Sequence, residues 1–104
     1  MLKKKLEKHI NAFLTSYLDD NEEFKALGDN DKLYIYSILR KLLALIHQVL
    51  RYPNVYPILL VQNYKSKEII LKAFREVELI IPTVSNIKIE VVNWKNEINI
   101  WCRN

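Results

Sequence analysis

The chain has 104 residues with one glycine, three prolines and one cysteine; half of its residues are hydrophobic and about a quarter are charged. This length and balance predict one soluble domain, residues 1–104, with a packed core. One cysteine excludes an internal disulfide and a cysteine-based zinc cluster, and one glycine excludes a glycine-rich phosphate loop.

Charge is distributed unevenly along the chain. Residues 1–31 carry five basic and seven acidic residues (net −2), residues 32–67 carry six basic residues and no acid (net +6), and residues 68–104 carry five of each. The whole positive excess of +4 therefore lies in the middle third, which also holds five of the six tyrosines.

Targeting and membrane signals are weak. Acidic and polar residues follow Lys3–Lys5 too soon for the apolar region of a signal peptide. The longest uncharged runs, Leu42–Leu50 and Tyr52–Tyr64, are too short to cross a bilayer as a helix. These features predict a cytoplasmic protein with no membrane partner. Abundant isoleucine, lysine and asparagine suggest an AT-rich genome, such as that of a virus or mobile element, and a viral protein would then lie in the host cytoplasm.

Two helices are predicted to form an N-terminal hairpin. Apolar residues spaced by three and four predict an amphipathic helix over Leu2–Leu18. A longer helix is predicted over Asp31–Arg51, with apolar residues around most of its circumference, so other elements must cover it on several sides. Its polar edge comprises Ser37, Arg40, Lys41, Ala44, His47, Gln48 and Arg51.

The connection between these helices is predicted to hold a short helical piece, Asn21–Leu27. Asp20 and Glu23 have the spacing of a capping box at its start. Gly28 fits a left-handed residue just past its end. Asp29, Asn30 and Asp31 are all acceptable N-caps of the long helix.

A strand and a third helix are predicted next. The continuous apolar run Ile58–Val61, just after Pro57, is typical of a strand buried on both faces. Ser66 is the predicted N-cap of a helix over Lys67–Val77, and Leu79–Ile81 is predicted to begin another strand.

A β-hairpin is predicted to end the chain. Residues 87–91 and 98–102 each alternate apolar with polar side chains, and a tight turn at Lys95–Asn96 sets their register. The predicted fold class is α+β: an N-terminal helical hairpin with a long central helix, then strand, helix and β-hairpin. The helices are expected to pack on one face of a small, mainly antiparallel sheet.

One face of this hairpin carries both tryptophans. Trp94 and Trp101 lie opposite the core-facing side chains, and Val92 widens the apolar patch; aromatic residues rimmed by charge are typical of protein interfaces. If another element covers this face, the tryptophans are core residues. If the face is open, a homodimer is its simplest use, because two copies can bury the same patch. The leading prediction is a small non-enzymatic binding protein whose partner is another protein or itself.

The alternative prediction is a regulatory module that binds DNA or RNA. Lysine and arginine neutralise phosphates, and tyrosines stack on unpaired bases. The competing interpretation is that these side chains only solvate the exposed edge of a buried helix. The candidate nucleic-acid-binding residues are Arg40, Lys41, Arg51, Lys65 and Lys67.

No catalytic residue, metal ligand or cofactor is predicted. His9 and His47 fall on different helices and lack the acidic pattern of a metal site. Cys102, at a strand end, fits a buried and inert thiol. The basic start of the first helix could lie on an anionic membrane surface, although its apolar stripe fits a core contact better.

Overall fold

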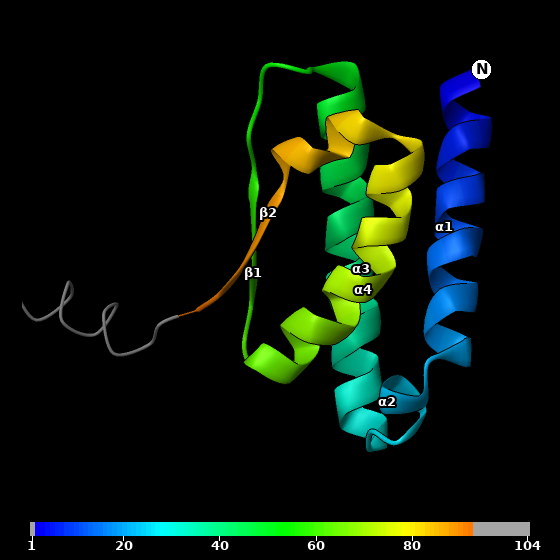
Figure 1. Ribbon diagram of the computed structural model, residues 1–104, viewed down its shortest axis with the longest axis vertical. Helices are drawn as coiled ribbons and strands as arrows, with labels where there is room; N and C mark the ends of the chain where they lie inside the picture. Colours follow the sequence, from blue (N-terminus) through cyan, green and yellow to red (C-terminus); the bar gives the residue numbers. More distant parts are fainter. Residues whose placement is uncertain (1, 93–104) are drawn as a thin grey trace, which may run out of the picture.

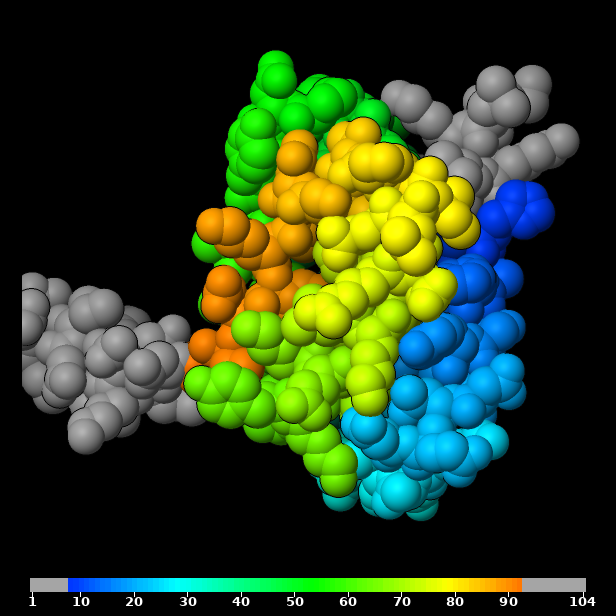
Figure 2. Space-filling model, in the orientation of Figure 1, coloured from blue at the N-terminus to red at the C-terminus, as the bar shows by residue number. Residues whose placement is uncertain are grey.

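A computed structural model describes the backbone of residues 2–92 and the side chains of residues 8–92. Figure 1 shows the elements in three layers, with α3 and α4 in the middle, a two-stranded sheet on one side and α1 on the other. In Figure 2, α4 lies between β2 and α1 across one face of the molecule. This is an α+β arrangement dominated by helices, in agreement with the predicted class. The elements in chain order are α1 (Leu2–Asp20), α2 (Glu22–Lys25), α3 (Asp29–Arg51), β1 (Ile58–Val61), α4 (Tyr64–Ile80), the 3-10 helix η1 (Pro82–Asn86) and β2 (Lys88–Val91).

The other elements pack around α3, as the sequence predicts. α3 contacts α1, α4, η1 and β1, and six of its apolar side chains are buried. It begins at Asp29, two residues earlier than predicted. Asp29 and Asp31 in its first turn and Arg51 in its last turn complement the helix dipole. The predicted polar edge lies at the surface, with His47 half-buried and its other members exposed.

Among the described residues, α3 is the one helix that is long and apolar enough to cross a membrane, with a mean hydropathy of 1.3. A helix at the centre of a soluble core has the same composition. About 33% of the apolar 18-residue window of α3 is buried inside the fold. A cytoplasmic location without membrane binding stays a prediction.

The N-terminal helix α1 packs across α3 and α4. Ile10, Leu14 and Leu18 are buried, and their spacing of four places them on one face of the helix. α1 contacts both α3 and α4, so this face covers the seam between them. The predicted helix over Leu2–Leu18 is confirmed and continues to Asp20.

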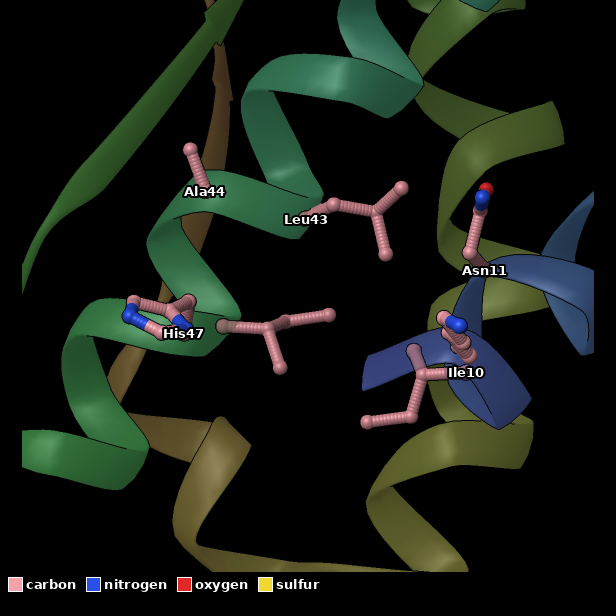
Figure 3. Close-up of a pocket in the computed structure, with 7 residues that line it drawn as sticks. Ile10, Asn11, Leu43, Ala44 and His47 are labelled. Atoms are coloured by element: carbon pink, nitrogen blue, oxygen red, sulfur yellow. The ribbon is translucent and has the colours of Figure 1, made fainter. Parts of the chain in front are cut away.

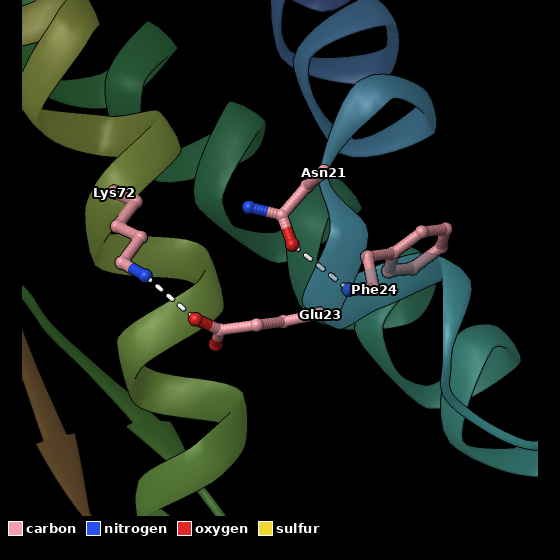
Figure 4. Close-up of polar contacts among 4 residues, drawn as sticks. All are labelled: Asn21, Glu23, Phe24 and Lys72. Atoms are coloured by element: carbon pink, nitrogen blue, oxygen red, sulfur yellow. Dashed lines mark hydrogen bonds and ion pairs between the residues drawn. The ribbon is translucent and has the colours of Figure 1, made fainter.

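A short helix, α2, connects α1 to α3, and its cap differs from the predicted one. The Asn21 Oδ1 atom accepts a hydrogen bond from the Phe24 backbone N–H at 2.8 Å (Figure 4). Asn21, and not Asp20, is therefore the N-cap of α2, because it stands three residues before the N–H that needs an acceptor. The predicted capping box of Asp20 and Glu23 is wrong. Gly28 is not left-handed either: its φ is −69°, and it is the N-cap of α3.

An ion pair joins α2 to α4. The Glu23 Oε1 and Lys72 Nζ atoms lie 2.7 Å apart (Figure 4). The hydrogen bond from Lys72 and its positive charge lower the pKa of Glu23, and the same contacts raise the pKa of Lys72.

We expect Glu23→Gln to reduce the loss of stability in acid. Because the pKa of Glu23 is lower in the folded than in the unfolded state, the pair stabilises the fold above pH of about 4.5, and this stabilisation is lost as the pH falls through the folded-state pKa. Urea unfolding at neutral pH and below pH of about 4 should therefore differ less for Glu23→Gln than for the wild type. Lys72→Met removes the same ion pair and should reduce the difference in the same direction. An identical pH dependence in Glu23→Gln and wild type would contradict this account.

The helix α4 begins earlier and ends later than predicted. The Asn63 Oδ1 atom accepts a hydrogen bond from the Ser66 N–H at 2.8 Å, so Asn63 is the N-cap and Ser66, predicted in that role, is buried in the first turn. The helix continues to Ile80, so the strand predicted from Leu79 is wrong. Pro82 lies two residues beyond α4, and the chain enters η1 there, because proline lacks the N–H that a continuing helix needs.

Asn63→Ala should destabilise the protein by about 1 kcal/mol, because it leaves an N-terminal N–H of α4 without its acceptor. Asn63→Asp keeps an acceptor and should stay close to the wild type. Chemical denaturation measures both, with the exposed neighbour Gln62→Ala as the control. Equal losses for Asn63→Ala and Gln62→Ala would show that the cap does not contribute.

The sheet is parallel, which corrects the prediction of a mainly antiparallel one. β1 and β2 pair in register from Ile58↔Lys88 to Val61↔Val91. α4 returns the chain from the end of β1 to the end at which β2 starts, and such a strand–helix–strand connection makes the strands parallel. The alternation in residues 87–91 predicts a strand there but not its partner, because the period of two is the same in both kinds of sheet.

One face of the described sheet packs on the helices, as predicted, and the other is exposed. Leu59 and Val61 of β1 are buried, whereas Ile58 and Leu60 are exposed, so the expectation of a strand buried on both faces is wrong for the described residues. The second strand of the predicted hairpin, residues 98–102, lies outside the described part of the chain.

Candidate protein-interaction surface

The exposed face of the β1–β2 sheet carries apolar side chains. Side chains alternate along a strand, so those that do not meet the helices point away from them. Ile58 is 57% exposed, Leu60 is 51% exposed, and Tyr56, two residues before Ile58, is 71% exposed. Ile58 and Leu60 of β1, Lys88 and Glu90 of β2, and the flanking residues of the same alternation form a surface that we call the outer sheet face: Tyr56, Ile58, Leu60, Lys88, Glu90 and Val92.

The two strands contribute different chemistry to the outer sheet face. The register places Ile58 beside Lys88 and Leu60 beside Glu90. An apolar row from β1 therefore runs next to one positive and one negative charge from β2. Such a surface can complement itself, since a two-fold rotation can bring the lysine of one copy to the glutamate of another.

The backbone hydrogen bonds show which residues of β1 face β2. The Lys88 N–H donates to the Pro57 carbonyl at 3.0 Å, and the Val92 N–H donates to the Val61 carbonyl at 2.8 Å. Since a parallel strand pairs with one neighbour through alternate residues, the odd-numbered residues of β1 bond to β2.

The even-numbered residues of β1 direct their backbone groups to the opposite edge. The next even-numbered residue follows the same rule: the Gln62 N–H donates to the Tyr34 hydroxyl at 2.8 Å and not to β2. Ile58 and Leu60 point their backbone N–H and carbonyl groups the same way, and no further strand pairs there among residues 2–92. An edge of this kind can accept a strand from another chain.

Of the three interface residues predicted from the sequence, one is described. Val92 is half-buried and continues the alternation of Lys88 and Glu90, which places it on the outer sheet face. Trp94 and Trp101 lie outside the described residues.

Sequence reasoning missed Ile58 and Leu60 as surface residues. Every position of the run Ile58–Val61 is apolar, so the sequence alone does not tell which two side chains face outward. A signal was nevertheless present: an apolar outer face expected around Val92 implies apolar neighbours on the adjacent strand.

Three of the candidate nucleic-acid-binding residues share one helix edge. Arg40, Lys41 and Arg51 are all exposed on α3. Their spacing puts Arg40 and Arg51 three helical turns apart on the same side of the helix.

The other two candidates lie elsewhere. Lys65 and Asp31 line a small cavity at the opposite end of α3 from Arg51, and the charge of Lys65 contributes to the lowered pKa of Glu23. Asp31 and Arg51 are roughly 30 Å apart at 1.5 Å per helical residue. Lys67 is half-buried in the first turn of α4. The structure therefore does not bring all five basic residues into one patch.

Within the described residues, no group of three histidine, cysteine, aspartate or glutamate side chains is placed to hold a metal ion. No protein-family model, curated protein or solved structure matches this chain. The functional argument therefore rests on the surfaces described above.

Proposed function

We propose that this chain is a small non-enzymatic binding protein that acts through protein–protein contacts, and that a second copy of the chain occupies the outer sheet face. The observation that supports this proposal most is that Ile58 and Leu60, on one face of β1, are each more than half exposed. Apolar side chains that gather on an exposed face usually mark an interaction site.

Two features favour a second copy as the occupant. Lys88 and Glu90 have opposite charges on the same face, so two identical surfaces can satisfy each other. The apolar side chains of Ile58 and Leu60 lie next to these charges, so the same two-fold contact would bury the apolar row of both copies.

Sedimentation equilibrium tests the proposal directly. With increasing concentration, the apparent mass should rise from 12.4 kDa toward twice that value and then stay constant, because a two-fold contact closes at the dimer. A mass that stays at 12.4 kDa up to a protein concentration of about 1 mM would contradict it. Even a dimer with a Kd of about 1 mM, which has a binding free energy of only about 4 kcal/mol, would be detected at that concentration.

Nucleic-acid binding is a second candidate, favoured by one observation. Arg40, Lys41 and Arg51 are exposed on one helix, and residues 32–67 contain no acid that could neutralise them. Fluorescence anisotropy of labelled DNA and RNA at two salt concentrations tests it. Binding should weaken steeply with salt and be lost in Arg40→Glu/Lys41→Glu, whereas salt-independent binding or none would exclude this function.

A further inference from the structure

The helix α1 and the sheet lie on opposite sides of α3 (Figure 1). Side chains of α1 and α3 line a groove (Figure 3). Ile10 of α1 and Leu43 of α3 point toward each other across it (Figure 3), and the buried Ile46 completes this apolar floor. Ala44 also lines the groove but is exposed at its α3 edge. The volume of the groove, about 510 Å³, is within the range of binding pockets for organic ligands and side chains.

The rim of this groove is basic on both sides. Lys8 lines it from α1. On α3, Arg40 precedes Ala44 by four residues, and Arg51 follows the lining residue His47 by four, so both arginines lie on the helix line that borders the groove.

No carboxylate of the described side chains on α1 or α3 borders the groove to balance this charge. Residues 8–18 and residues 32–51 contain no aspartate or glutamate, and the side chain of Glu7 lies outside the described part. The other six acidic residues of this half of the chain lie at the other end of the two helices: Asp19, Asp20, Glu22, Glu23, Asp29 and Asp31.

We propose that this groove binds an acidic amphipathic helix of a partner protein. The line from Arg40 to Arg51 is roughly 16 Å long, which is the length of three helical turns. Apolar side chains at positions i, i+4 and i+7 of such a helix would enter the floor, and acidic side chains on its flanks would meet Lys8, Arg40 and Arg51. A nucleic-acid backbone needs the basic rim but not the apolar floor, so the combination favours a helix.

The test uses the full chain and two labelled synthetic helical peptides. Both peptides carry leucine at i, i+4 and i+7; one has glutamate on the flanks of this stripe, and the other has lysine there. Fluorescence anisotropy should show binding of the glutamate peptide and at least about tenfold weaker binding of the lysine peptide. This difference should shrink as salt is raised, because salt screens the exposed charges.

Ala44→Trp places a large ring at the α3 edge of the groove and should weaken binding of the glutamate peptide by about tenfold or more, with circular dichroism as the check that α3 remains folded. Ala26→Trp is the matched control, because Ala26 is exposed at the end of α2, far from the groove. Leu60→Lys should bind the peptide as the wild type does, so a failure of the proposed self-association would not affect this result.

Three outcomes would overturn the proposal: equal binding of both peptides, no binding of the glutamate peptide, or an unchanged affinity in Ala44→Trp. Labelled duplex DNA in the same assay supplies a fourth. If DNA binds through Arg40 and Arg51 and Ala44→Trp leaves that affinity unchanged while the peptide does not bind, the basic rim is a nucleic-acid surface.

Discussion

Leu42→Ala should destabilise the protein by about 2–5 kcal/mol. Leu42 is fully buried in the middle of α3, the helix that α1, α4, η1 and β1 all contact. Truncation removes apolar contacts and leaves a cavity that several packed elements must collapse to fill. A domain of this length has a total stability of about 5–15 kcal/mol, so the loss should lower Tm by roughly 10 °C or more.

The same helix provides the control for this prediction. Leu33 is 66% exposed near the start of α3, so Leu33→Ala should change the stability by no more than about 0.5 kcal/mol. Urea unfolding of both variants measures the difference. If Leu33→Ala cost as much as Leu42→Ala, α3 would not be the buried centre of this fold.

Leu60→Lys should weaken self-association by about a hundredfold. Leu60 lies on the outer sheet face beside Glu90, and a lysine there would replace an apolar contact with a charge and would compete with the Lys88 of the second copy for Glu90. In a two-fold dimer the substitution occurs twice, so a cost of about 1.5 kcal/mol at each site corresponds to a hundredfold increase in Kd. Sedimentation equilibrium measures this change.

Leu79→Lys is the matched control, because Leu79 is also an exposed leucine but lies at the end of α4, away from the sheet. Its Kd should equal that of the wild type. Equal weakening by Leu60→Lys and Leu79→Lys would mean that general surface hydrophobicity, and not the outer sheet face, drives association. Unfolding curves of both variants should match the wild type, since neither side chain is part of the core.

The helices could be predicted because their signal is local and repeats many times. α1 and α3 each contain several turns of apolar residues at spacings of three and four, and one anomalous residue does not change that pattern. Their ends could not be predicted to the residue. Asp20 and Asn21 are both acceptable N-caps of α2, and Gly28 is an acceptable N-cap of α3. Which residue caps each helix depends on backbone geometry that the sequence does not specify.

Strand pairing could not be predicted because it depends on residues far apart in the sequence. The alternation in residues 87–91 gave the correct inward-facing side chains, Ile87 and Ile89. Whether that strand pairs with its neighbour in sequence or with β1 depends on where α4 packs, and a sequence pattern does not contain this information.

The candidate surfaces, like the fold, could be predicted only where the signal is local. The sequence predicted the outward direction of Val92 from alternation alone, but the exposure of Ile58 and Leu60 follows from the parallel pairing of β1 with β2. The groove between α1 and α3 requires the relative placement of two helices, so periodicity gives its floor residues only as parts of two apolar stripes.

Amide hydrogen exchange at two protein concentrations tests most directly whether the outer sheet face binds a second copy. Between a concentration well below the Kd and one well above it, the amides of Ile58 and Leu60 should exchange more slowly in the concentrated sample, because the second copy covers the face of β1 and excludes water from it. The amides of α1 and η1 should exchange at the same rate in both samples. Concentration-independent exchange at Ile58 and Leu60, or new protection on another element alone, would contradict the proposed contact.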